Sequence, residues 1–221
     1  MTTAQQRLHH ALDALDRTAR PGPRVDGCTH CFTPAQLGAL AGPPALLPNG
    51  LLHSAAAKHP THWGDFPTLY RRLAPRVLRQ LTTGRLDLDG SLVGARLYAA
   101  NWREWPSADL VQAVLDAWWD TTLDHYPARP SAPETFETLT AASGSPTPWL
   151  HTWSATPTPA ADTHLADTLT TWLSDGELPD LRLGFYSDLP VGPELLAWLL
   201  TLPPSRIRDD QRQLLEPTPS H

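Results

Sequence analysis

The sequence predicts an all-α protein, either an irregular multi-helix bundle or a solenoid-like stack of antiparallel helices. Three observations support this fold class. Apolar residues recur at intervals of three and four along almost the whole chain, which is the period of an amphipathic helix. Many of the 24 prolines fall where helices should begin. No strand–helix–strand unit is apparent, and Leu181–Tyr186, the one segment that could be a strand, is too short to found a sheet.

In the first half of the chain, prolines and glycines divide the helical pattern into separate segments. Leu8, Leu12 and Leu15 mark the apolar side of a first helix, which Pro21-Gly22-Pro23 follows as a break. Thr33-Pro34 combines an N-cap with a proline in the first helical turn, so a second helix should begin there and end near residue 41. Further helices are expected over 51–58, from the cap at Asp65 to about 83, and over 92–102.

The second half continues in the same way. A helix rich in leucine and tryptophan should follow a cap at Ser107 and reach Leu123. Later helical segments are expected over 131–142, over 149–153, from Thr158-Pro159 to a stop at Asp175-Gly176, over 190–202 and over 204–215. We interpret 181–186 as an extended segment or a single helical turn.

Length and composition indicate one helical domain over residues 1–216, with two lobes, 1–142 and 148–216, as the alternative division. Apolar residues make up 41% of the chain and charged residues 18%, which is a globular composition. Residues 217–221 should form a flexible tail.

Charge and hydropathy exclude some classes of partner. The net charge of −6 disfavours nucleic acid, and no apolar run approaches the roughly 20 residues that span a bilayer. The first residues lack the apolar core of a signal peptide, so we expect a cytoplasmic protein. Every basic side chain except Lys58 is an arginine, which is typical of a GC-rich bacterium.

The sharpest chemical signal is Cys28-Thr29-His30-Cys31, which contains the only two cysteines of the chain. Structural zinc takes four cysteine or histidine ligands in a tetrahedron, and two cysteines at this spacing can share one ion. The remaining ligands are expected among the nearby histidines His30, His59 and His62, with His53 as an alternative. The sequence therefore gives a candidate zinc site.

Two other interpretations of the same cysteines remain open. Cys31 stands just before a predicted helix, where the helix dipole favours a thiolate, so the pair could serve as a redox centre or sensor. Thiol oxidoreductases of that type place the motif after a strand, which this chain lacks. Alternatively, Cys28 and Cys31 are small apolar side chains that pack in a loop.

Two further groups are candidates for a partner or ligand surface. Trp119 lies about a quarter-turn away from the apolar stripe that contains Trp118, so we expect an exposed contact residue. Arginines on one helix face could clamp a phosphate or carboxylate: Arg71, Arg72, Arg76 and Arg79. The simpler interpretation is a solvated face paired with acids such as Asp116, Asp120 and Asp124.

Four short motifs occur in a fixed order: Cys28-x-x-Cys31, His62-Trp63-Gly64-Asp65, Leu73-Ala74-Pro75-Arg76-Val77-Leu78, and Ala100-Asn101-Trp102-Arg103-Glu104-Trp105-Pro106. This order resembles a family of hypothetical bacterial proteins with a Cys-x-x-Cys start, a Trp-Gly-Asp turn, a Leu-Pro-Arg helix and a Trp-x-x-Trp-Pro helix end. Phe185-Tyr186-Ser187-Asp188 is similar to its final segment. The family has an aromatic-rich helix before the Trp-Gly-Asp turn, whereas residues 54–58 here are a serine, three alanines and a lysine. The resemblance implies an all-helical unit and no mechanism.

Together these observations predict a non-enzymatic interaction or adaptor protein that binds another protein and carries a zinc site in its Cys28–Cys31 loop. The first alternative is a thiol redox protein or sensor that uses Cys28 and Cys31. The second is a small-molecule binder with a cavity between helices, which Trp118 and Tyr98 would line.

Overall fold

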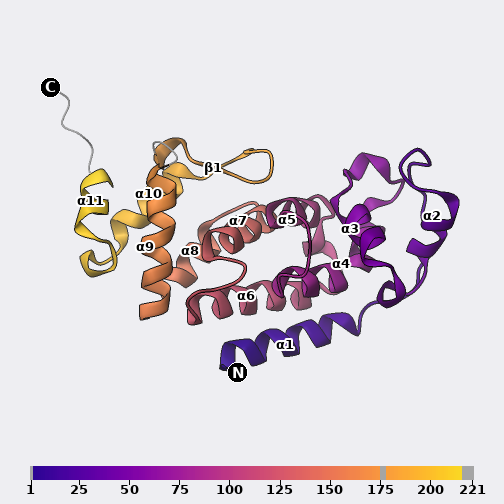
Figure 1. Cartoon of the computed structure of the whole chain (residues 1–221), viewed down its shortest axis with the longest axis horizontal. Coiled ribbons are helices and arrows are strands. Elements are labelled where there is room, and N and C mark those ends of the chain that lie inside the picture. Colours follow the sequence, from indigo (N-terminus) through magenta and orange to yellow (C-terminus); the bar gives the residue numbers. More distant parts are fainter. Residues whose placement is uncertain (1, 175–177, 216–221) are drawn as a thin grey trace.

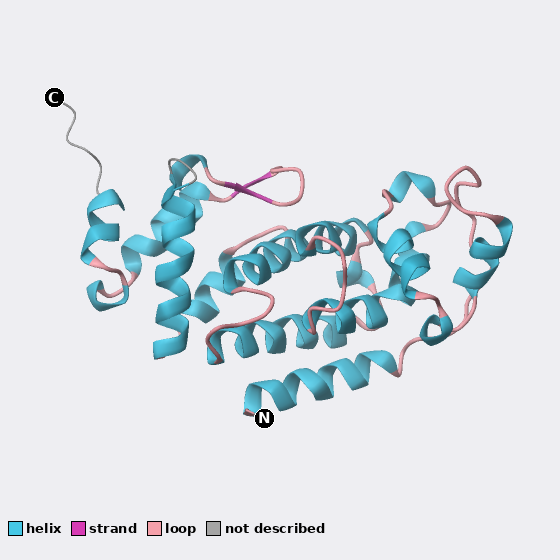
Figure 2. Ribbon diagram, in the orientation of Figure 1, coloured by secondary structure: helices cyan, strands magenta, loops and turns pink. Residues whose placement is uncertain are grey.

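The computed structural model describes residues 2–174 and 178–215. Over these residues the amphipathic segments fold into eleven α-helices and one short β-hairpin with strands of two residues each (Figures 1 and 2). The predicted all-α, multi-helix fold is confirmed. Within the described residues, no helix is both long enough and apolar enough to cross a bilayer. The predicted helix stop at Asp175-Gly176 and the tail at 217–221 lie outside the described residues.

The first half of the chain carries five α-helices and three short 3-10 turns. The helices are α1 (Thr3–Asp16), α2 (Pro34–Ala41), α3 (Asn49–Ala57), α4 (Phe66–Thr82) and α5 (Gly90–Ala99). The 3-10 turns are η1 (Pro44–Leu46), η2 (Pro60–His62) and η3 (Trp102–Glu104). Two predicted caps are confirmed: Thr33 Oγ1 accepts from the Gln36 N–H, and Asp65 Oδ1 accepts from the Thr68 N–H. The third, Ser107, precedes its helix but makes no side-chain capping bond.

The second half adds six α-helices and the hairpin. The helices are α6 (Ala108–Asp124), α7 (Ala132–Ser143), α8 (Thr147–Ser154), α9 (Pro159–Ser174), α10 (Gly192–Thr201) and α11 (Asp209–Leu215). Strand β1 (Arg182–Leu183) pairs antiparallel with β2 (Leu189–Pro190), and two 3-10 turns, η4 (Leu178–Asp180) and η5 (Pro204–Arg206), complete the chain. The extended interpretation of 181–186 therefore holds for its first part.

Two predicted helices differ from the structure. The helix expected over 204–215 divides into η5 and α11, because Ile207 takes an extended conformation between them. The helix expected to run to residue 102 ends at Ala99, because Asn101 adopts a left-handed conformation with φ of 51°. Asparagine tolerates this conformation better than most residues, and it redirects the chain into η3.

The helices pack in layers, with the most extensive contacts between α5 and α7 and between α1 and α6. Figure 1 shows α6 between α1 on one side and α7 on the other. Gly94 lets α5 approach α7 closely, since a Cβ atom at this position would lie 2.3 Å from the Thr138 carbonyl oxygen. One continuous set of buried side chains extends from Leu8 in α1 to Leu215 in α11.

Trp119 is not the exposed contact residue that the sequence predicted. Its side chain is fully buried, and its indole N–H donates to the Trp149 carbonyl at 3.0 Å. The error came from treating α6 as a helix with one buried face. Because α6 contacts α1 as well as α7, α8 and α9, its apolar side chains are covered in more than one direction.

A buried arginine holds the C-terminal elements together. Arg206 in η5 forms an ion pair with Asp162 at 2.6 Å and donates to the carbonyls of Trp153, Ser154 and Thr156. These groups belong to α8, α9 and the link between them, so a single guanidinium joins η5 to both helices.

Candidate metal centre

The two cysteines lie in the connection between α1 and α2, where backbone hydrogen bonds close a tight turn. The N–H groups of Cys31 and Phe32 both donate to the Cys28 carbonyl at 3.0 Å. The turn folds the chain back on itself between the two cysteines, which keeps their side chains close together.

A second segment, from η2 to Trp63, runs alongside this loop. The Cys28 N–H donates to the His62 carbonyl at 2.8 Å, and the Gly64 N–H donates to the Asp26 carbonyl at 3.0 Å. These bonds form an antiparallel bridge between Gly27 and Trp63. The bridge fixes the register of the two segments and places His62 beside Cys28.

Gly27 is required by the close approach of the two segments. A Cβ atom on Gly27 would lie 2.7 Å from the Trp63 ring and 2.9 Å from a methyl group of Leu37. The Trp63 ring is buried and packs against Phe32 with a centroid separation of 4.9 Å. Gly27 and Trp63 thus position the site without supplying a ligand, and sequence reasoning did not assign them this role.

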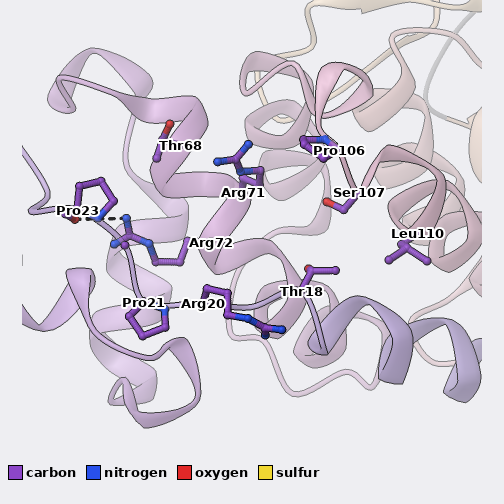
Figure 3. Close-up of a pocket in the computed structure, with 11 residues that line it drawn as sticks. Thr18, Arg20, Pro21, Pro23, Thr68, Arg71, Arg72, Pro106, Ser107 and Leu110 are labelled. Atoms are coloured by element: carbon purple, nitrogen blue, oxygen red, sulfur yellow. Dashed lines mark hydrogen bonds between the residues drawn. The ribbon is translucent and has the colours of Figure 1, made fainter.

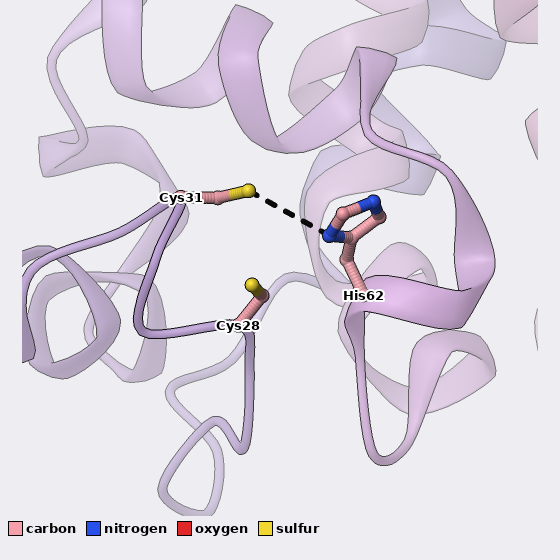
Figure 4. A group of neighbouring side chains, drawn as sticks. All are labelled: Cys28, Cys31 and His62. Atoms are coloured by element: carbon pink, nitrogen blue, oxygen red, sulfur yellow. Dashed lines mark hydrogen bonds between the residues drawn. The ribbon is translucent and has the colours of Figure 1, made fainter.

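Cys28, Cys31 and His62 bring one potential metal-ligand atom each to the same place (Figure 4). All three atoms lie within 4.8 Å of one another, and Cys31 Sγ is 3.6 Å from His62 Nδ1. A tetrahedral zinc ion with bonds of about 2.3 Å to sulfur and about 2.0–2.1 Å to nitrogen separates those two ligand atoms by about 3.6 Å. The observed sulfur–nitrogen distance therefore fits a shared ion, and two thiolates with one imidazole form a donor set that suits zinc.

The electrostatics of the loop favour the thiolate form of Cys28. Hydrogen bonding with His62, followed by the backbone N–H groups of Cys31 and His30 and the Cys31 thiol, lowers the pKa of Cys28 to about 6. A thiolate is the form that binds a metal or acts as a nucleophile. At neutral pH the loop thus presents the ligand in its reactive state.

The other predicted histidines take different positions. His30 is exposed, and His59 Nδ1 lies 2.8 Å from the Thr61 hydroxyl and accepts from the Thr61 N–H, so it caps η2. His53 Nε2 is 2.8 Å from the Gln80 side-chain oxygen. The structure therefore brings together Cys28, Cys31 and His62 and leaves His30 and His59 outside the group.

A cavity of about 490 Å³ opens beside two of the three side chains. Cys31 and His62 line it together with Lys58, His59 and Arg96, and Tyr186 reaches it from the loop of the β1–β2 hairpin. Three protein ligands next to open space are typical of a metal site that accepts a fourth ligand from outside the first three residues. The fourth ligand would enter from this cavity.

The arginines predicted as a ligand or partner surface mostly make structural bonds. Arg72 is buried and donates to the Leu40 carbonyl at 2.6 Å, and Arg76 donates to the Pro44 carbonyl at 2.7 Å. Arg79 forms ion pairs of 2.6 Å with Asp13 and Asp16 of α1. Pairing with Asp116, Asp120 and Asp124 is thus wrong for Arg72, Arg76 and Arg79, whose partners include backbone carbonyls of α2 and η1 and the carboxylates of α1.

No family model, no curated protein and no solved structure matches this chain. The resemblance to a bacterial family, which the order of motifs suggested, therefore stays a prediction.

Proposed function

We propose that Cys28, Cys31 and His62 bind one zinc ion, and that this ion fixes the connection between α1 and α2 in a cytoplasmic helical protein whose activity is to bind another protein. The observation that carries the zinc assignment is the 3.6 Å separation of Cys31 Sγ and His62 Nδ1, beside a Cys28 thiol that the same imidazole stabilises as thiolate.

A metal ion at this place has a structural purpose. Helix α1 ends at Asp16 and α2 begins at Pro34, and the connection between them contains no helix or strand of its own. Long connections of this kind seldom hold a single conformation without an additional constraint. Zinc binding would lower the free energy of the folded state relative to the unfolded chain and would hold the Cys28–Cys31 turn against η2.

The partner-binding part of the proposal rests on the hairpin loop. Phe185 and Tyr186 are 46% and 59% exposed, with their rings edge to face at 4.9 Å. Exposed aromatic side chains frequently anchor protein–protein interfaces. Because Tyr186 also lines the cavity beside Cys31 and His62, a partner that covers the hairpin would reach the zinc site.

The zinc proposal is tested by metal analysis of protein purified without added zinc. We expect about one zinc ion per chain, and loss of that ion in Cys28→Ser, Cys31→Ser and His62→Ala. His53→Ala serves as the matched control, since His53 binds Gln80 outside the group and its removal should leave the zinc content unchanged. A wild-type protein without metal would contradict the proposal.

The partner proposal is tested with the double variant Phe185→Ser/Tyr186→Ser in the cell from which the chain derives. A protein that co-purifies with the wild type should be lost with this variant and retained with Leu214→Ser, which removes an exposed apolar side chain elsewhere. Equal recovery with both variants would contradict a role for the hairpin.

A thiol redox function is the second candidate, because the two sulfur atoms lie within 4.8 Å of each other on one turn of chain. A metal-free protein that forms a reversible Cys28–Cys31 disulfide would establish it in place of the zinc site.

A further inference from the structure

A second cavity, of about 450 Å³, lies where the segment after α1 meets the first turns of α4 and α6 (Figure 3). Its polar wall contains Arg20 from the segment after α1, Arg71 and Arg72 from α4, and Ser107 at the start of α6. Its volume is within the range of sites for small molecules. None of these residues belongs to the Cys28, Cys31 and His62 group.

The described wall of this cavity is cationic, with three arginines and no carboxylate among its lining residues. The net charge of the whole chain is −6, so the cavity concentrates positive charge in an otherwise acidic protein. Asp65 interacts electrostatically with Arg71 and Arg72, but its carboxylate already accepts from the Thr68 N–H as the N-cap of α4. The cationic charge in the cavity is thus incompletely balanced.

The three guanidinium groups differ in how they are held. Arg72 is 93% buried, since its relative exposure is 7%, and the carbonyls of Leu40 and Pro23 fix it in place. Arg20 is exposed and donates only to the neighbouring Ala19 carbonyl, and the structure assigns Arg71 no hydrogen bond within the described residues. Figure 3 shows Arg20 and Arg71 on opposite sides of the cavity. A guanidinium that lacks a carboxylate partner retains its paired donors for an oxyanion such as a carboxylate or phosphate.

The remaining wall completes an amphipathic site. Ser107 makes no capping bond to the α6 backbone, and the start of this 17-residue helix carries partial positive charge. Pro21, Pro106 and Leu110 add apolar surface next to the cationic groups. The site can therefore contact both an oxyanion and an apolar body attached to it.

We propose that this cavity binds a small molecule that carries a phosphate or carboxylate group on an apolar body, with Arg20 and Arg71 as the direct ligands of the oxyanion and Arg72 as a fixed positive charge behind them. This site would act independently of zinc.

The test uses titration calorimetry of the full chain with phenyl phosphate and, separately, benzoate at matched ionic strength. The double variant Arg20→Gln/Arg71→Gln removes the two exposed arginines and leaves the buried Arg72 in place. The control Arg85→Gln/Arg129→Gln makes the same change of charge at two exposed arginines outside the cavity. Circular dichroism of each variant verifies that it is folded.

The wild type should bind at least one of the two compounds with a dissociation constant of about 1 mM or tighter, and the Arg20→Gln/Arg71→Gln variant should bind it at least about tenfold more weakly. The control variant should match the wild type within about twofold. Binding of phenyl phosphate alone would identify a phosphate ligand, and binding of benzoate alone a carboxylate. Absence of binding by the wild type, or equal loss in both variants, would overturn the proposal.

Discussion

The substitution Gly27→Ala should damage the metal centre without changing any ligand. The new methyl group would lie 2.7 Å from two carbon atoms of the Trp63 ring and 2.9 Å from a Leu37 methyl group. Carbon atoms in contact prefer a separation of about 3.5–4.0 Å, so the segments must move apart by about 1 Å. Trp63 cannot retreat easily, because its ring is buried against Phe32.

The size of this displacement sets the expected effect. Insertion of a methyl group into a packed site costs about 1–3 kcal/mol of folding free energy. Metal ligands must hold their bond lengths within about 0.2 Å, so a 1 Å shift between the Cys28 loop and His62 should weaken zinc binding by about tenfold or more. Urea unfolding of the metal-free protein measures the first quantity, and competition with a chromophoric chelator measures the second.

Gly38→Ala is the matched control in the neighbouring helix α2. A Cβ atom on Gly38 meets nothing within 4 Å, so this substitution should stabilise the protein by about 0.5–1 kcal/mol and leave zinc affinity unchanged. If Gly27→Ala and Gly38→Ala had the same effect on zinc affinity, the bridge between Gly27 and Trp63 would not be what positions the ligands.

Four other predictions concern the metal ligands, the Cys28 thiol and the buried Arg206. His62→Ala should abolish stoichiometric zinc binding, whereas His59→Ala, three residues earlier, should retain it in equilibrium dialysis. Alkylation of Cys28 in the metal-free protein should reach half its maximal rate near pH 6 and shift to higher pH in His62→Ala, because His62 makes the largest contribution to the lowered pKa. The lowered pKa also means that Cys28 favours folding increasingly as the pH rises from about 6 to 9 and loses this contribution as the pH falls through 6, which urea unfolding at several pH values would detect. Arg206→Gln should cost about 3 kcal/mol in urea unfolding, since it removes a buried cation with an ion pair and three carbonyl partners, whereas Arg208→Gln breaks an exposed ion pair and should cost less than about 1 kcal/mol.

The helices were predictable because their signals are local. Thr33 and Asp65 begin helices through bonds to amides three residues later, and the leucine period of α1 depends only on its own sequence. The periodicity of the sequence does not indicate how many other helices pack around a given helix. Trp119 was misplaced for this reason, since α1 and the three helices that follow α6 all contact it.

The metal centre was predictable in its cysteines and only partly in its histidines. His59 and His62 stand three apart in one short segment, so spacing does not choose between them. The choice depends on Thr61, which binds the His59 ring, and on the bridge that pairs Gly27 with Trp63. Long-range backbone pairing of this kind leaves no periodic signal in the sequence. The glycine directly before Cys28 is the one local sign that another segment packs closely against this loop.

The arginines show a third limit. Carbonyls in the last turn of a helix lack intrahelical N–H partners, and Arg72 donates to such a carbonyl at Leu40 near the end of α2. Arg76 donates to the Pro44 carbonyl of η1, which also accepts from the Leu47 N–H. The sequence placed both arginines correctly on one helix but could not show that their partners would be carbonyls in another part of the chain.

X-ray absorption at the zinc K-edge of the purified protein tests the central claim most directly. The account predicts two sulfur neighbours at about 2.3 Å and at least one nitrogen neighbour at about 2.0–2.1 Å in the wild type, and loss of this sulfur-containing zinc signal in Cys28→Ser and His62→Ala. A coordination shell of nitrogen and oxygen alone, or a spectrum unchanged in both variants, would contradict it.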